Sequence, residues 1–338
     1  MSPLVLGIET SCDETAVALA RNGEVLASRV ASQEIHARWG GVVPEIASRL
    51  HQRTLSKMVR EILADEGFTL QDINTVGATR GPGLIGALLV GTSYAKGLAT
   101  GLGVPFIGVN HLEGHLWSAA ASGEEMPLPA LALLVSGGHT ELFRIDGFRK
   151  YTFLGATLDD AVGEAFDKVG VLLGIPYPAG AEVSRLAEKG NPQTFPFRVA
   201  QTDSPFDFSF SGLKSAVMRE VKRLEREKTD PESWSADLAA SFQESAVLQL
   251  SVRVNRALEN DQYRSILLGG GVAANRRLRE RLSGVADRHN VRLVVPPVTY
   301  CTDNAAMIAW VAERALREQG GDSLTLEADP NLTISAES

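Results

Sequence analysis

The sequence predicts an α/β protein of two lobes separated by a central cleft, and a repeated pattern of strands is the main evidence. An apolar strand, a turn of small or polar residues, a second strand and an X-Gly hairpin occur near residues 4–31 and again near 130–147. Asn22-Gly23 and Asp146-Gly147 are the hairpin turns. The chain has 338 residues, which is too long for one compact core. We therefore expect an internal duplication in which each copy opens one lobe.

Strands and helices alternate through the rest of the chain, as apolar residues change between alternating and helical spacing. We expect helices at 44–67, 84–102, 111–122, 158–173, 213–228, 234–258, 273–282 and 304–318, with strands at 75–79, 105–109, 264–268 and 291–295. Residues 190–210 are expected to form a long ordered loop. The predicted domains are an N-terminal lobe at 1–124, a C-terminal lobe at 125–302, and a final helix and tail at 303–338 that pack back on the N-terminal lobe.

Composition excludes several classes of protein. Hydrophobic residues make up 44% and charged residues 22% of the chain, and no run of 18 apolar residues could span a membrane. The N-terminus lacks the basic segment of a signal peptide, and the only two cysteines, Cys12 and Cys301, indicate a reducing compartment. We therefore expect a cytoplasmic protein. The net charge of −8 means that nucleic-acid binding would need local basic patches or a basic partner.

A pair of histidines is the most specific feature. His111 and His115 are four residues apart on a predicted helix, so both imidazoles face the same way and could hold one metal ion. Glu113 stands two residues after His111, far around the helix, where it cannot easily act as the base of a zinc protease. The histidines could instead be satisfied by local hydrogen bonds. Asp303 is the best candidate for a third ligand, and its alternative role is to cap the final helix.

Two glycine-rich turns each follow an apolar strand. Ser136-Gly137-Gly138 and Gly269-Gly270-Gly271 could bring backbone N–H groups close to a phosphate, although either could be a plain tight turn. The second turn precedes a helix whose N-terminus would favour an anion. Neither turn matches a dinucleotide-binding or P-loop motif.

Acidic residues supply further candidates. Asp13 and Glu14 share a turn between strands and could bind a metal, orient phosphate or act as a base, or they could simply be solvated. Asp167 lies on a predicted helix and could bond a ribose hydroxyl or form a surface ion pair. Basic residues gather on three predicted helices and could follow a phosphate backbone, although such faces are usually solvated. The clusters are Arg49, Arg53, Lys57 and Arg60; Lys214, Arg219, Lys222, Arg223 and Arg226; and Arg276, Arg277, Arg279 and Arg281.

These motifs together resemble the TsaD family, once labelled O-sialoglycoprotein endopeptidase. The resemblance runs in order from about residue 4 to residue 312. It is carried by 9–15 (ETSCDET), the His111/His115 pair, 134–139 (LVSGGH), 166–168 (FDK), 209–214 (SFSGLK), 269–275 (GGGVAAN) and 302–304 (TDN). The chain departs from the family pattern at 177–181, where it has YPAGA instead of YPGGP, and it lacks the Arg-Pro-x-Trp element near the C-terminus.

The resemblance implies the two-lobed actin/sugar-kinase/Hsp70 (ASKHA) fold and a specific reaction. Such proteins transfer a threonylcarbamoyl group from threonylcarbamoyl-AMP to N6 of the adenosine 3′ of the anticodon, in tRNAs that read ANN codons, and they release AMP. One iron(II) or zinc ion would be held by His111, His115 and Asp303. The adenylate would be bound by Leu134, Val135, Ser136, Gly137, Gly138, Asp167, Gly180 and Asn275.

Roles and partners follow from the same resemblance. Asp13 and Glu14 are our candidates for orienting the amine or accepting its proton. The family works with TsaB-like and TsaE-like subunits, and TsaB pairs through the N-terminal lobe. A metalloprotease, a small-molecule kinase of the same fold and a non-enzymatic nucleotide-binding scaffold are the alternatives. The position of Glu113 disfavours the first, and a histidine metal site would serve no purpose in the second.

Overall fold

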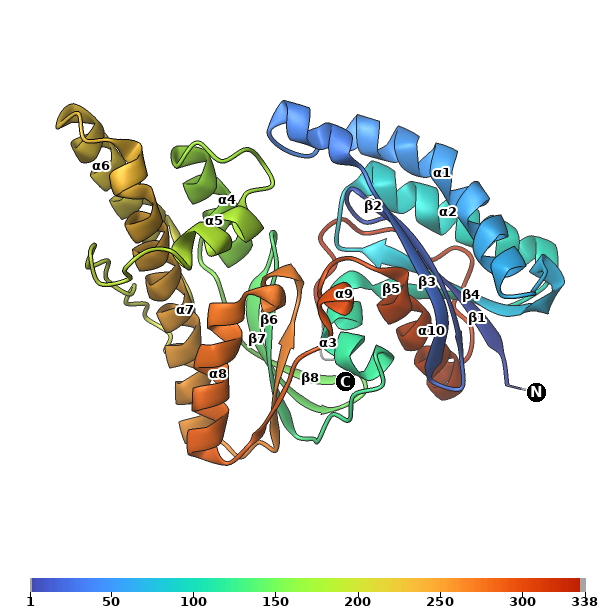
Figure 1. Cartoon of the computed structure of the whole chain (residues 1–338). Coiled ribbons are helices and arrows are strands. Elements are labelled where there is room, and N and C mark those ends of the chain that lie inside the picture. Colours follow the sequence, from blue (N-terminus) through green and yellow to red (C-terminus); the bar gives the residue numbers. More distant parts are fainter. Residues whose placement is uncertain (1, 335–338) are drawn as a thin grey trace. The chain divides into compact units, whose positions relative to one another are not determined.

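A computed structural model describes residues 2–334, which form two compact units. Of the described residues, the first unit contains 2–125 and 296–334, and the second contains 126–295. Each unit is built on a five-stranded mixed sheet (Figure 1). None of the described helices is long and apolar enough to cross a bilayer.

The sheet of the first unit has the order β3-β2-β1-β4-β5. Its strands are β1 (Leu4–Glu9), β2 (Glu14–Arg21), β3 (Glu24–Ser32), β4 (Ile73–Gly81) and β5 (Phe106–Asn110). The first three form an antiparallel meander, while β1, β4 and β5 are parallel. Strand β1 is buried on both faces, which agrees with its continuous apolar run.

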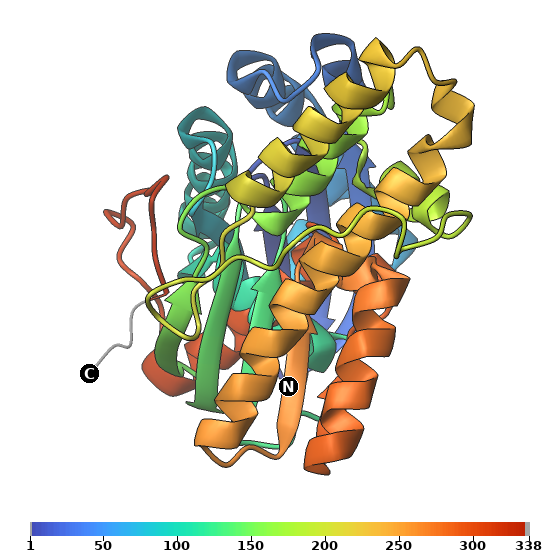
Figure 2. The same ribbon diagram turned by 90° about the vertical axis from the view of Figure 1, so that its left-hand side faces the viewer.

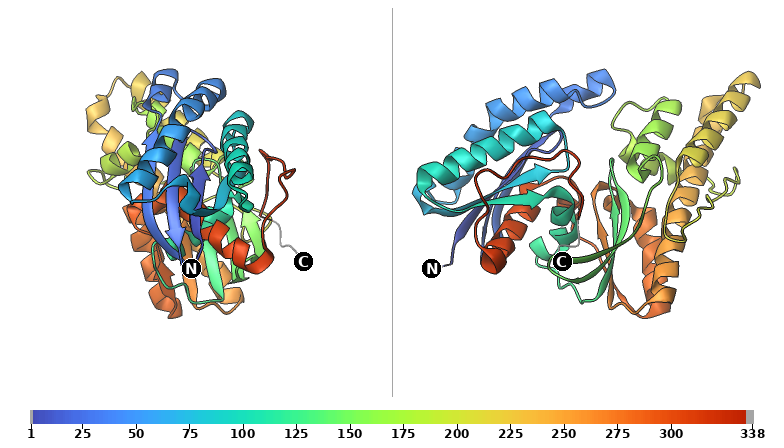
Figure 3. Two further views of the ribbon diagram at one scale, coloured as in Figure 1. Left: turned by 90° about the vertical axis from the view of Figure 1, so that its right-hand side faces the viewer. Right: turned by 180° about the vertical axis from the view of Figure 1, so that it is seen from behind.

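Helices cover both faces of this sheet (Figure 3). Helices α1 (Pro44–Asp65) and α2 (Ile85–Leu102) pack on one face, and α10 (Ala305–Gln319) packs on the other beside α3 (His111–Ala121). Glycines allow α10 to approach the strands closely. A Cβ added at Gly7 would lie 2.6 Å from the backbone nitrogen of Ala309, and one at Gly77 would lie 2.4 Å from Cβ of Ala312.

The second unit repeats this topology, with the order β10-β9-β6-β7-β8. Its strands are β6 (Ala130–Val135), β7 (Thr140–Gly147), β8 (Lys150–Ala156), β9 (Ser265–Gly269) and β10 (Arg292–Val294). Strands β6, β7 and β8 form the meander, and β6, β9 and β10 are parallel. The α/β class and the internal duplication predicted from the sequence are therefore confirmed.

Helices of the second unit pack on its sheet and on one another (Figure 2). They are α4 (Val162–Leu172), α5 (Gly180–Ala187), α6 (Ser211–Arg226), α7 (Ser235–Asn260) and α8 (Arg276–His289). Helix α7 also holds the long loop before α6. Its buried Arg253 donates from Nε to the carbonyl of Asp207 and from Nη2 to the carbonyl of Ala200. The expected ordered loop is thus fixed by a side chain of α7.

Several boundaries differ from the sequence predictions. Helix α4 begins at Val162 rather than 158, because Asp159 is used to bind the backbone nitrogens of Phe210 and Ser211 at the start of α6. The helix expected at 273 begins at Arg276, after a 3₁₀ turn at Gly271–Ala274. Helix α5 was not predicted, since it has only eight residues and begins with a glycine. The end of the predicted tail, 335–338, lies outside the described residues.

Candidate metal centre and ligand-binding loops

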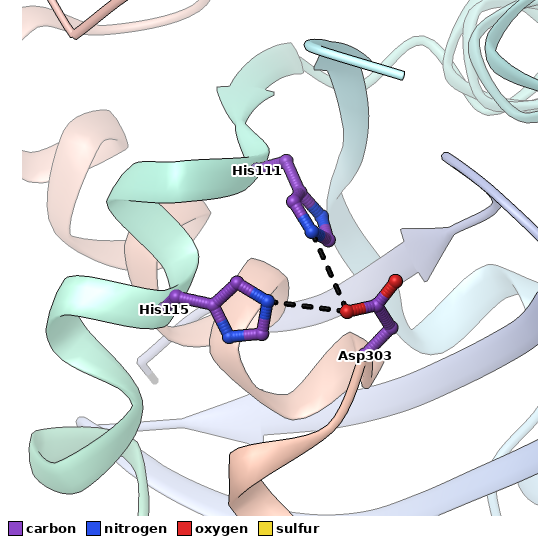
Figure 4. Close-up of side chains that lie close together, drawn as sticks. All are labelled: His111, His115 and Asp303. Carbon is purple, nitrogen blue, oxygen red and sulfur yellow. Dashed lines mark hydrogen bonds and ion pairs between the residues drawn. The ribbon is translucent and has the colours of Figure 1, made fainter. Parts of the chain in front are cut away.

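Three side chains of the first unit converge on one point (Figure 4). His111 and His115 come from α3, and Asp303 comes from the loop between α9 (Val298–Cys301) and α10. One ligand atom from each residue lies within 4.8 Å of the other two. Oδ1 of Asp303 is 3.1 Å from Nε2 of His115 and 3.4 Å from Nε2 of His111. The structure therefore brings together all three residues that the sequence suggested as metal ligands.

Local capping interactions produce this arrangement. Oδ1 of Asn110 accepts hydrogen bonds from the backbone nitrogens of Leu112 and Glu113, so α3 begins at His111 and places His115 one turn later. At the other side of the site, Asn304 caps α10 by accepting from the backbone nitrogen of Met307 at 3.0 Å. The N-cap role considered for Asp303 thus belongs to Asn304, and the Asp303 carboxylate faces the imidazoles instead.

Glu9 contacts Nδ1 of the His111 ring, while Nε2 of the same ring faces Asp303. The Glu9 carboxylate is fully buried at the end of β1, and its Oε2 lies 2.9 Å from Nδ1 of His111 and 2.6 Å from the hydroxyl of Thr79. Its Oε1 accepts the backbone N–H of Ser11. With Nδ1 of His111 directed at Glu9, Nε2 would be left to offer its lone pair to a bound metal ion. The sequence analysis did not single out Glu9, although an acid that ends a buried apolar strand was an available signal.

The charges of the site are strongly coupled. Burial acts to lower the pKa of His111, but the carboxylates of Asp303 and Glu9 outweigh it and hold that pKa well above its usual value. Burial acts to raise the pKa of Asp303, but His111 and His115 hold it below its usual value. The protein alone therefore favours a positive charge between these side chains. A bound cation can provide that charge in place of a proton.

The donor set suits a transition metal or zinc. Two imidazole nitrogens and one carboxylate oxygen are the ligands that divalent iron and zinc accept, and three protein ligands leave further coordination positions open. The hydrogen bond from His111 to Glu9 matches the usual support of a ligating histidine. Glu113 does not belong to the converging group. The residues present therefore fit a metal ion, and they lack the arrangement of a zinc protease.

Asp13 lies in the turn between β1 and β2, and Glu14 is the first residue of β2, in the same unit. Burial is the main factor that raises the pKa of Glu14 to about 9, and the charges of Asp303 and Asp13 add to it. The effect of Asp303 shows that Glu14 is electrostatically linked to the metal-ligand group. A cation there would oppose this shift, because a positive charge favours the ionised carboxylate.

The first glycine-rich turn follows β6 in the second unit. Leu134 and Val135 are buried at the end of that strand, whereas Gly137 and Gly138 are exposed. A Cβ added at either glycine would meet no atom within 4 Å. The hydroxyl of Ser136 accepts hydrogen bonds from the backbone nitrogens of Gly138 and His139 and fixes the turn. These glycines therefore leave open space beside the backbone.

The second glycine-rich turn packs directly against the strand that carries the first. Gly270 has a φ of 87°, and a Cβ there would lie 2.4 Å from the carbonyl oxygen of Val135. Asn275 caps α8 by accepting from the backbone nitrogen of Leu278. This cap uses one of the free N–H groups at the N-terminus of α8, and the anion site expected there stays a prediction.

The other predicted binding residues of the second unit lie in one hydrogen-bonded group. Oδ1 of Asp167 accepts from the backbone nitrogens of Ala179 and Gly180 at 2.8 and 2.9 Å, so it anchors the start of α5. Burial raises the pKa of Asp167 despite these bonds. Nδ2 of Asn275 donates to the Ser184 hydroxyl of α5 and to Oε1 of Gln243 of α7. The structure thereby connects Asp167 to Gly180, and Asn275 to the same helix α5.

A hollow of about 410 Å³ lies beside this group. Ser184 and Gln243, the partners of Asn275, line it together with Glu188, Ala240, Arg276 and Glu280. Its size is in the range of small-molecule sites. Apart from Arg276, none of these residues was singled out from the sequence, because they come from three helices and no local motif joins them.

Comparison with solved structures identifies the class of fold. HypF from T. kodakarensis aligns with a TM-score of 0.60 at 15% identity, over 94% of this chain and 48% of that chain. The Acidaminococcus fermentans (R)-2-hydroxyglutaryl-CoA dehydratase component A aligns with a TM-score of 0.54 at 15% identity, over 94% of this chain and 100% of that chain. With the two repeated sheets, these likenesses define an ASKHA-type fold.

Sequence comparison identifies the family. The model of the family "TsaD: tRNA N6-adenosine threonylcarbamoyltransferase" matches residues 24–310. Relatives of that name from Fervidobacterium nodosum and Symbiobacterium thermophilum are 44% and 47% identical, over 97% and 98% of this chain and 98% and 97% of their own length. The chain therefore belongs to the TsaD family. It is a transferase that acts on tRNA, and the protease and kinase alternatives receive no support.

Proposed function

We propose that this chain transfers threonylcarbamoyl from threonylcarbamoyl-AMP to N6 of the adenosine 3′ of the anticodon, in tRNAs that read ANN codons. The proposal extends the family assignment to a donor, an acceptor position and a site. The convergence of His111, His115 and Asp303 is the observation that carries it. A scaffold that only bound a nucleotide would not need buried imidazoles supported by a buried carboxylate.

His111, His115 and Asp303 would hold one divalent ion per subunit, with iron(II) as our first choice and zinc as the second. When bound, such an ion supplies Lewis acidity and a template for an oxygen of the donor. The protein's own part is to keep both Nε2 atoms directed at Asp303, and Glu9 contributes by bonding Nδ1 of His111.

The exocyclic amine of adenosine is a weak nucleophile, so the reaction depends on positioning and on removal of a proton. In the step, the N6–carbonyl carbon bond forms, the bond from that carbon to the AMP oxygen breaks, and AMP leaves. Asp13 and Glu14 are the groups that we assign to orient the amine and to accept its proton. Because its pKa is raised to about 9 in the protein alone, Glu14 would accept that proton only with a cation at His111, His115 and Asp303, whose charge would lower the pKa again.

The loops of the second unit would bind the adenylate. The acyl and phosphate end of the adenylate would be bound by Leu134, Val135, Ser136, Gly137 and Gly138. Open space lies beside the last two of these residues. Asp167, Gly180 and Asn275 would surround the nucleoside, and the adjoining hollow could take the base. In this division the N-terminal lobe, 1–124, carries the metal histidines and the partner face. Residues 125–302 carry the nucleotide loops, and 303–338 pack back on the N-terminal lobe.

TsaB-like and TsaE-like subunits are the proposed partners, and the reaction would take place in the cytoplasm. Helix α2 supports a partner face on the first unit, because Ile85 and Leu89, one turn apart, are 46% and 49% exposed. Exposed apolar side chains that lie together are a feature of protein–protein interaction sites.

Incorporation of radiolabelled threonine into tRNA tests the proposal, with the donor-forming enzyme and partner subunits present. We expect His111→Ala to lower the transfer rate by roughly 100-fold or more, since Lewis-acid catalysis contributes several kcal/mol. His289→Ala is the control, because His289 lies at the end of α8, in the second unit, and its ring bonds the side chain of Asn255. Full activity of His111→Ala would refute the catalytic metal site. Absence of incorporation by the unmodified complex would refute the reaction itself.

A further inference from the structure

Many of the basic residues noted in the sequence pair with acids within the fold. On α8, Arg276 pairs with Glu280, while Arg277 and Arg281 both pair with Glu244. On α6, Lys214 pairs with Asp160, and Arg223 pairs with Glu220 and Glu227. Guanidinium and ammonium groups held in this way are poor candidates for binding a phosphate, because the acids would first have to be displaced.

Arg198 and Arg219 are different. Within residues 2–334 neither guanidinium has an ion-pair or hydrogen-bond partner, and both side chains are exposed. They line one hollow of about 340 Å³, between the loop that precedes α6 and helices α6 and α7. The residues that line this hollow include no acid. In a chain with a net charge of −8, two free cations at one acid-free hollow indicate an anionic ligand.

The hollow is held open by buried hydrogen bonds. Gln249 of α7 is 1% exposed, and it accepts the backbone N–H of Ala200 and donates to the carbonyl of Ser209. Ser245 donates to the carbonyl of Phe197, and Arg253 bonds the carbonyl of Ala200. A long loop without regular structure that is fixed in this way is usually functional. The surface is therefore organised before any ligand arrives.

An aromatic ring lies at the same hollow. Phe197 is half-buried there and stacks on Phe195, with ring centroids 6.3 Å apart and an angle of 17° between the planes. Free arginines beside an aromatic ring are the combination by which proteins bind single-stranded nucleic acid, since the cations contact phosphates and the ring contacts a base.

We propose that the hollow formed by Phe197, Arg198 and Arg219 binds a phosphate-bearing, unpaired nucleotide of the substrate tRNA. This inference rests on the tRNA specificity of the family, and it adds a docking surface apart from the reacting groups. The hollow would give this acidic protein one local site of positive charge for a polyanion.

The test is the affinity of the full chain, with its partner subunits, for a labelled unmodified tRNA transcript at several salt concentrations. We expect the double variant Arg198→Gln/Arg219→Gln to bind on the order of tenfold or more weakly at low salt. The slope of log affinity against log salt should fall by about 1.4 to 1.8, the value for two lost phosphate contacts. The control is Arg223→Gln/Arg314→Gln, which loses the same charge from arginines already paired with glutamates.

Phe197→Leu separates base contact from charge. We expect this variant to bind roughly fivefold or more weakly, as loss of one stacked base would require, with an unchanged salt slope. In steady-state assays the double arginine variant should raise KM for tRNA and keep kcat. An unchanged affinity and slope in that variant would overturn the proposal, as would an equal loss in the control. Absence of threonine transfer with normal tRNA binding would refute only the reaction proposed above.

Discussion

Replacement of Glu9 by glutamine should weaken metal binding while the three ligands stay in place. The amide has nearly the shape of the carboxylate, so the buried site need not collapse. Oε2 of Glu9, however, faces both Nδ1 of His111 and the Thr79 hydroxyl, while Oε1 accepts from Ser11. An amide has one oxygen and one NH₂ group, so it cannot accept hydrogen bonds at both positions.

The size of the effect follows from this geometry. Loss of the carboxylate that supports a ligating histidine typically costs 10- to 100-fold in metal affinity. That range corresponds to about 1.4 to 2.7 kcal/mol. We expect the upper part of the range, because Glu9 is fully buried and its charge is close to His111.

Competition between the protein and a chelator of known affinity gives the dissociation constant for zinc or cobalt directly, without an activity assay. Asp322→Asn is a suitable control, because Asp322 is in the same unit and also bonds a backbone nitrogen, that of Gly108. Equal metal affinity in Glu9→Gln and the unmodified protein would refute the assignment of Glu9 as the support of His111.

Two further predictions concern stability. Burial raises the pKa of Glu141 to about 7, so between pH 4.5 and 7 the folded state binds more protons than the unfolded state and stability falls as pH rises. Glu141→Gln should therefore have a free energy of unfolding about 1–3 kcal/mol higher than that of the original protein at pH 8, and no such gain at pH 4. Denaturant titration at both pH values measures this, and an equal difference at the two would refute it. Gly77→Ala should destabilise by about 1–3 kcal/mol in thermal unfolding, because its Cβ would overlap Ala312, whereas Gly97→Ala, which meets no atom within 4 Å, should not destabilise.

The features predicted correctly from the sequence are those that short segments of the chain determine by themselves. The repeated hairpins specify both meanders, and the four-residue spacing of His111 and His115 needs only a helix to become a pair of ligands. Capping was harder to predict, because Asp303 and Asn304 are both good N-cap residues and only the tertiary fold shows which one is used. The ion pairs of α8 could not be predicted from the sequence either, since Glu244 is 33 residues before Arg277 in the chain.

The two copies of the duplicated fold differ in the charge that follows the central strand of the sheet. The turn after β1 and the turn after β6 occupy the same place in the two sheets, between the central strand and its antiparallel neighbour. In the first copy the preceding strand ends in Glu9, the turn carries Asp13 and β2 begins with Glu14, so the position is acidic and suits a cation. In the second copy the turn is Ser136-Gly137-Gly138, without charge and with open space beside the backbone, so it suits an anion. Exchange of Gly137 for aspartate should therefore weaken adenylate binding and leave metal affinity unchanged, which calorimetric titration with AMP and the chelator competition would measure separately. A parallel loss of both would show that the two strand ends do not have the separate roles that this comparison assigns to them.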